Sequence, residues 1–287
     1  MTYLSSRQLS RQFLFRCTLL AISLSAESPA SAHDKWLEVE PAATAQPAPT
    51  KVYLATGEAL RQPELLPERR ARRVLSFEVR SAAGVKNLAS SFREDQQPIA
   101  ALPSLPRGSH LIRFDSSPID IELDATKFGA YLLDERLIDV LSERQRRAEE
   151  DAPGRERYSR HLKALVQVGD KLDPLVAQPV GQELEIIPLA MPHSLRAAQE
   201  LQFKVLFRGQ PLSGRAVSMA HKWRNRVAEV FQRTSDAGIV KFAVEPRGQW
   251  LIRLIHMYRA EGPDAAAGLD WRSHWASLSF SYAEGSP

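Results

Sequence analysis

Short apolar segments alternate with turn-forming residues throughout the last third of the sequence, and this spacing constrains the fold more than any other feature. Glycine and proline mark the turns, as in Arg208–Gly214 and Thr234–Gly238. The strand-like segments are residues 201–207, 215–223, 239–244, 249–257 and 274–282. Short strands with a turn about every 8–12 residues are typical of a β-sandwich. We therefore expect a C-terminal sandwich that is immunoglobulin-like or transthyretin-like.

The N-terminal half is also predicted to be β-rich, with a helical insertion around residues 126–150. Apolar residues recur there at the three- and four-residue spacing of an amphipathic helix: Phe128, Tyr131, Leu132, Ile138 and Leu141. A length of 287 residues suits one or two domains. We predict a mainly β chain of one or two antiparallel β-sandwich domains. The first is expected to cover residues 33–175, including the helical insertion, and the second residues 176–287.

The first 32 residues have the composition of a secretory signal peptide. Arg7, Arg11 and Arg16 form a positive segment, residues 17–26 form a short apolar segment, and residues 30–32 (A-S-A) form a cleavage site. The apolar segment is shorter than the ~20 residues that span a bilayer, so no membrane insertion is expected after cleavage. Cleavage predicts a mature chain that starts at His33 in the bacterial periplasm.

Cysteine content, charge and motifs narrow the class of function. The single cysteine, Cys17, lies in the predicted signal peptide, so neither a disulfide scaffold nor a multi-cysteine metal site is expected. The formal net charge of +4 is small, which argues against nucleic acid as a partner. The sequence lacks the G-x-S-x-G, H-E-x-x-H, Walker and G-x-G-x-x-G motifs. We therefore do not expect an enzyme.

His33 offers two nitrogen ligands if it is the first residue of the mature protein. A metal displaces the proton of its α-amino group near neutral pH, because the ordinary pKa of that group is ~7.7–8.0. The imidazole of the same residue binds nickel, cobalt, copper or zinc. The alternative is that His33 is simply the residue that follows a cleavage site.

Strand alternation supplies candidates for a second histidine ligand. Side chains alternate across a sheet, which places His221, His256 and His274 each on the apolar face of its strand. The alternative for each of these histidines is a structural role, as a hydrogen-bonded side chain in the core or at the edge of the core. The other histidines fall at loop or strand ends and are predicted to lie at the surface: His110, His161 and His193.

A series of motifs follows the same order along almost the whole mature chain. They are A-H-D-x-W-L-E (32–38), G-R-E-R-Y-S-R (154–160), L-E-I-I-P-L (184–189), L-F-R-G-Q-P-L-S-G (206–214), T-S-D-A-G (234–238), G-Q-W-L-I-R-L-I-H-M (248–257) and D-W-R-S-H-W-A-S-L-S-F (270–280). In order and spacing they resemble a periplasmic family of unknown function that is described as the periplasmic component of nickel/cobalt uptake systems. The resemblance implies export, a β-sandwich body and the binding of nickel or cobalt before transport across the inner membrane.

The resemblance also assigns residues by position. His33 and His256 match the family's recurring histidines, and Asp34 matches the acid that follows, as a carboxylate ligand or the hydrogen-bond partner of a ligand. His274 stands where the family more often has an aromatic residue, and His221 lies in a less regular stretch.

These features together predict an exported metal-binding protein that captures or delivers nickel or cobalt. An inner-membrane nickel/cobalt transporter is the expected partner. Copper and zinc are alternatives, because the same ligands bind them. Two other functions stay open. One is a metal-free module that binds another envelope protein, and the other is a copper enzyme in which His33 and a second imidazole form an oxidative histidine brace.

Overall fold

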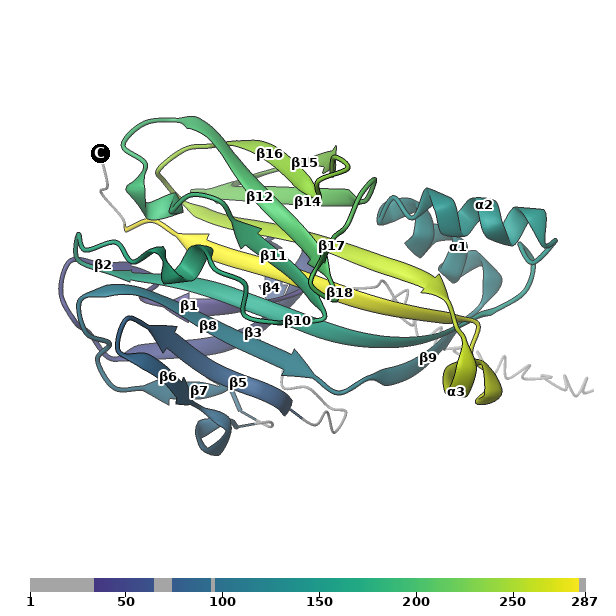
Figure 1. Cartoon of the computed structure of the whole chain (residues 1–287), viewed down its shortest axis with the longest axis horizontal. Coiled ribbons are helices and arrows are strands. Elements are labelled where there is room, and N and C mark those ends of the chain that lie inside the picture. The colour runs from purple at the N-terminus through teal and green to yellow at the C-terminus, as the bar shows by residue number, and fades with distance from the viewer. Residues whose placement is uncertain (1–33, 65–73, 94–95, 284–287) are drawn as a thin grey trace, which may run out of the picture.

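A computed structural model describes residues 34–64, 74–93 and 96–283 of the chain (Figure 1). Strands account for 52 % and helices for 14 %, which confirms the mainly β prediction. The predicted signal peptide and His33 lie outside the described residues. Within them, no helix combines the length and the apolar character needed to cross a bilayer.

Three sheets form the body of the protein. The N-terminal sheet consists of β1 (Asp34–Glu40), β3 (Thr50–Glu58), β4 (Arg61–Glu64) and β7 (Ala100–Leu102). The C-terminal sheet consists of β11 (Leu184–Pro188), β12 (Gln199–Phe207), β13 (Gln210–Pro211) and β16 (Ile239–Val244). The central sheet has ten strands: β2 (Ala43–Thr44), β5 (Val74–Ser81), β6 (Gly84–Asn87), β8 (Gly108–Ser116), β9 (Ile119–Leu123), β10 (Gly154–Val168), β14 (Ala216–Trp223), β15 (Arg226–Arg233), β17 (Gln249–Arg259) and β18 (Trp271–Ser281).

The central sheet joins the two halves of the chain. Its main order is β15-β14-β17-β18-β10-β8-β5-β6, and β2 and β9 also pair with β10. Strand pairs in this sheet are antiparallel except where β10 meets β18 and β2 in parallel. The predicted boundary after residue 175 falls between β10 and β11, and strands from both sides of it belong to this one sheet.

Both faces of the central sheet are covered because its apolar residues alternate between them. On the face toward the C-terminal sheet, Phe203 and Phe242 pack in one core with Leu278. On the opposite face, Leu54 of the N-terminal sheet packs in a second core with Val166. Sheets packed face to face around these cores confirm the β-sandwich prediction.

The helical insertion is confirmed, but it consists of two helices. Asp124 caps α1 (Ala125–Asp134) by accepting a hydrogen bond from the Lys127 backbone N–H at 2.8 Å. Arg136 then takes a positive φ of 57°, which interrupts the helical path before α2 (Ile138–Arg146). Both helices lie at one end of the long strands (Figure 1), where their apolar side chains share a core with Trp275.

Short helical segments complete the fold. α3 (Gly262–Ala266) connects β17 to β18. Three single-turn 3₁₀ segments are η1 (Ala89–Ser91), η2 (Pro174–Ala177) and η3 (Pro192–Ser194).

Candidate metal centre

A group of polar residues interrupts the apolar face that the central sheet presents to the C-terminal sheet. Leu254 of β17 and Ala276 of β18 belong to the core on this face. The next inward position on each strand, two residues closer to α3, is a histidine: His256 on β17 and His274 on β18. His256 lies opposite His274 in the β17–β18 register, and Ser159 of β10 lies beside His274 in the β10–β18 register. These side chains are buried, so their polar atoms need partners within the protein.

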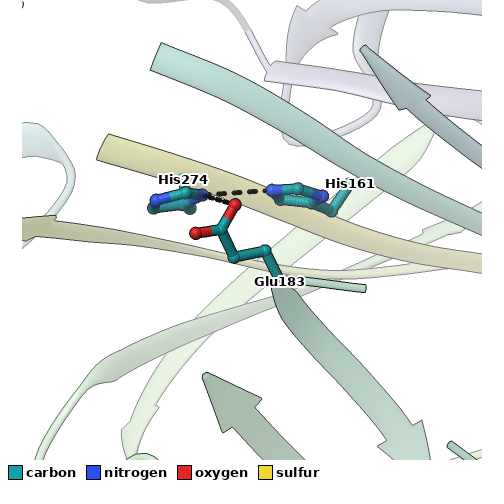
Figure 2. A group of neighbouring side chains, drawn as sticks. All are labelled: His161, Glu183 and His274. Carbon is teal, nitrogen blue, oxygen red and sulfur yellow. Dashed lines mark hydrogen bonds and ion pairs between the residues drawn. The ribbon is translucent and has the colours of Figure 1, made fainter. Parts of the chain in front are cut away.

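His161 brings a second imidazole to His274 (Figure 2). The distance from His161 Nε2 to His274 Nδ1 is 3.2 Å. Glu183, directly before β11, places Oε2 3.7 Å from the same His274 nitrogen. One ligand atom from each of these three residues lies within 4.8 Å of the other two. Two imidazoles and a carboxylate are donors that divalent transition metals accept.

The centre is enclosed on the sheet side and open toward Glu183. His274 is 0 % exposed and His161 is 5 % exposed. The Glu183 side chain is 37 % exposed. An ion would therefore meet Glu183 before it met either imidazole.

Asp115 of β8 determines which nitrogen of His161 carries the proton. Asp115 Oδ1 lies 2.8 Å from His161 Nδ1, and a carboxylate only accepts, so Nδ1 is the protonated nitrogen. Burial acts to raise the pKa of Asp115, but hydrogen bonds and charge interactions with His161 and Arg113 outweigh burial, and the pKa is lowered. In the neutral ring the lone pair then lies on Nε2, the atom that faces His274. Metal-binding histidines are commonly oriented by a carboxylate in this way.

His274 is held in its neutral form. Burial, together with the smaller influence of the neighbouring His161 and Arg272, lowers the pKa of His274 to about 2. The Tyr258 hydroxyl lies 3.3 Å from His274 Nε2. If Nδ1 carries the proton, it donates to His161 Nε2 while Nε2 accepts from Tyr258. If Nε2 carries the proton, it donates to Tyr258 and both facing lone pairs are free for an ion. The geometry therefore suits a hydrogen-bonded pair of imidazoles as well as a pair of ligands.

Two guanidinium groups border the centre. Arg208, in the turn after β12, pairs with Glu183 at 2.9 Å and donates to the Tyr258 hydroxyl at 3.2 Å. Arg272 donates to Ser159 Oγ at 3.3 Å. These positive charges oppose a cation, so an ion must gain more from its ligands than it loses to their repulsion.

The predicted ligand His256 is close to this centre but has a different environment. The Phe207 ring contacts both imidazoles, with centroid distances of 4.5 Å to His256 and 5.3 Å to His274. Burial, with a smaller contribution from the Arg215 charge, lowers the pKa of His256 to about 4. His256 Nδ1 is buried and has no hydrogen-bond partner among the described residues.

His221 and Asp34 lie away from the His161–His274 pair. His221 stacks flat on Trp250 at 3.8 Å, and its Nε2 lies 3.1 Å from the Arg247 carbonyl oxygen. Asp34 is buried against Arg253, which projects from β17 toward the opposite face from His256, and its Oδ2 lies 2.8 Å from Arg253 Nε. Burial raises the pKa of Asp34 against the lowering influence of Arg253.

Asp34 also lines a separate pocket of about 600 Å³, beside α1 and β15. His33, the predicted amino-terminal ligand, precedes Asp34 and lies outside the described residues.

The prediction that three histidines lie at the surface is wrong. All of them are less than a tenth exposed: His110, His161 and His193. His161 was expected at a loop or strand end, but β10 begins seven residues before it, at Gly154, and carries His161 into the middle of the central sheet. Each of the other two histidines donates a hydrogen bond from Nε2 to a backbone carbonyl oxygen. The acceptor is the Pro106 oxygen for His110 and the Ser281 oxygen for His193.

Alternation along β10 is the signal that identifies His161. Ser159 and His161 share one face of the strand, and β10 pairs directly with the strand that carries His274. Glu183 has no comparable signal, because it lies in the connection before β11.

Comparison with known proteins identifies a family for most of the chain. The model of the family described as Domain of unknown function (DUF4198) matches residues 30–258, which include His161 and Glu183 but not His274. No curated protein matches the chain.

Proposed function

This chain belongs to the DUF4198 family, whose function is unknown, and we propose that it is an exported periplasmic protein that binds one divalent transition-metal ion between His161, Glu183 and His274. Its proposed role is to capture or deliver nickel or cobalt for an inner-membrane transporter. The signal-peptide composition of residues 1–32 supports export, and the motif resemblance supports the link to nickel and cobalt.

The spacing of the two imidazoles carries the metal-binding proposal. Two ligands that each bond at ~2.0–2.1 Å to one tetrahedral ion are separated by ~3.3 Å. His161 Nε2 and His274 Nδ1 are 3.2 Å apart. This spacing supports the proposal, because little movement of either strand would be needed for both nitrogens to bind the same ion.

The ligand chemistry is compatible with nickel, cobalt, copper and zinc. Imidazole binds all four, and the Irving–Williams order makes copper the tightest in a site that imposes no geometry. The amino-terminal site, in which His33 and Asp34 are ligands, stays a separate prediction. Asp34 is in the N-terminal sheet and contacts Arg253 on the face of the central sheet opposite to the His161–His274 pair, so one ion is not shared between them.

A metal-free interaction module remains the second candidate function, and one observation favours the metal-free part of it. The chain of contacts from Asp115 through His161 and His274 to Tyr258 is complete without an ion. In that case the buried imidazoles would serve only to hold β10 and β18 together.

Calorimetric titration of the chelator-treated mature protein with nickel, cobalt, copper and zinc separates the two functions. The metal proposal expects one ion per chain and at least about tenfold weaker binding in His161→Gln and in His274→Gln. His193→Gln is the matched control, because His193 is also a buried histidine but contacts Ser281 instead. Wild-type affinity in both ligand variants, or no binding by the wild type, would overturn the proposal.

A further inference from the structure

Ser159 is a third donor that faces the two imidazoles. It precedes His161 by two residues on β10, so both side chains point to the same face, and it is the register partner of His274. Its Oγ lies 3.2 Å from His274 Nδ1 and 3.5 Å from His161 Nε2. With the distance of 3.2 Å between the two nitrogens, the three atoms form a nearly equilateral triangle.

We infer that Ser159 is a further ligand of the ion, an inference that rests on the proposed function. The corners of a triangle with sides of ~3.3 Å lie ~1.9 Å from its centre. An ion with bonds of ~2.0–2.1 Å to all three corners therefore sits within ~1 Å of their plane. Glu183 Oε2, 3.7 Å from His274 Nδ1, supplies the fourth corner from the solvent side.

Two nitrogens and two oxygens in this arrangement would suit a tetrahedral ion better than a planar one, because three of the donors form a compact triangle. Copper(II) and nickel(II) favour square-planar or tetragonal arrangements of nitrogen and oxygen ligands, whereas zinc favours four tetrahedral ligands. Of the two ions in the proposed function, cobalt therefore suits this arrangement better than nickel, and zinc would suit it as well as cobalt.

The surroundings of Ser159 are compatible with a neutral hydroxyl ligand. Arg272 Nη2 donates to Oγ at 3.3 Å and so occupies one of its two lone pairs. The other lone pair is available to the ion, and the hydroxyl keeps its proton. No bond is made or broken other than the bonds to the ion.

The same residues also follow the order of a hydrolytic triad, with Ser159, His161 and Asp115 as nucleophile, base and carboxylate. Ser159 is only 3 % exposed, however, and it does not line the 600 Å³ pocket beside α1 and β15. An enclosed hydroxyl suits an ion better than a substrate carbonyl.

Cobalt spectroscopy of Ser159→Cys tests this assignment. A cobalt–thiolate bond gives an intense near-ultraviolet charge-transfer absorption that nitrogen and oxygen ligands do not give. We expect this absorption in Ser159→Cys at one equivalent of cobalt, and about tenfold weaker cobalt binding in Ser159→Ala. Ser277→Cys is the matched control, because Ser277 is equally buried on β18 but faces the N-terminal sheet.

Each outcome distinguishes the inference from the function on which it rests. If the wild type binds cobalt through His161, but Ser159→Cys lacks the thiolate absorption and Ser159→Ala binds normally, Ser159 is not a ligand and the metal centre stands. If neither the wild type nor any serine variant binds cobalt, the metal function fails together with the inference. Thermal unfolding of every variant confirms that the compared proteins are folded.

Discussion

Arg208 and His274 engage different oxygens of the same carboxylate. Arg208 donates to Glu183 Oε1 from Nε at 3.0 Å and from Nη2 at 2.9 Å, whereas Oε2 faces His274 Nδ1 at 3.7 Å. Glu183 is therefore shared between an exposed guanidinium and the buried imidazoles. An ion that uses this carboxylate must compete with Arg208 for its charge.

Removing the charge of Arg208 should strengthen metal binding. We expect Arg208→Gln to lower the Kd for cobalt about two- to fivefold, since an exposed charge contributes ~0.5–1 kcal/mol. Arg247→Gln is the control, because Arg247 pairs with Glu245 in the same exposed manner away from the centre. Unchanged or weaker binding in Arg208→Gln, measured by calorimetry, would show that Arg208 does not compete with the ion.

Loss of the Asp115 charge should weaken the centre without removing a ligand. In Asp115→Asn the group that orients His161 Nδ1–H is lost, and such changes cost ~10–100-fold in metal affinity. Asp120→Asn serves for comparison, because Asp120 is exposed and pairs with Arg157. Equal affinities in the two variants would remove Asp115 from the metal centre.

An alanine inserted before His33 discriminates between the two metal sites. The insertion converts the predicted α-amino ligand to an amide, which should abolish a site built on His33 and Asp34. The centre at His161 and His274 should keep its affinity, because Asp34 of the N-terminal sheet lies against the opposite face of the central sheet. Calorimetry of the extended and the native mature protein measures both outcomes, and a large loss would place the main site at the amino terminus.

His193 should make the folded protein less stable in acid. Burial lowers the pKa of His193 to about 4, whereas the imidazole of an unfolded chain has a pKa of ~6.5. Between these values the unfolded chain binds a proton that the folded chain does not, so stability falls as the pH drops below ~6.5 and is fully present above it.

The slope expected from His193 alone is ~1.4 kcal/mol per pH unit. Urea unfolding of metal-free protein between pH 7.5 and 5 measures it, and His193→Gln should lack this part of the slope. A variant that retains the full wild-type slope would assign the acid sensitivity to other groups.

Local patterns in the sequence predicted much of the fold. The turns at residues 208–214 and 234–238 separate strands as expected, because glycine and proline impose turn geometry on a few neighbouring residues. The phases of β17 and β18 placed His256 and His274 on one face, and the register sets them opposite each other. The helical insertion was recognised from its apolar spacing, but the break at Arg136 has no equally clear signal.

The His161–His274 pair was not predictable in the same way. The two residues are 113 positions apart, and they meet only because β10 pairs in parallel with β18. No local pattern specifies which distant strands become neighbours in a sheet. The position of Glu183 was equally hard to predict. It lies in a connection, where side chains do not alternate as they do in a strand, so the sequence does not indicate which way its side chain points.

The parallel pairing of β10 with β18 has a mechanical consequence. His161 belongs to the half of the chain before residue 175, whereas Glu183 and His274 belong to the half after it. A bound ion would cross-link these halves at the β10–β18 pairing. Because the ion would bind the folded state only, it would stabilise this pairing, and release of the ion would lower the free energy of unfolding.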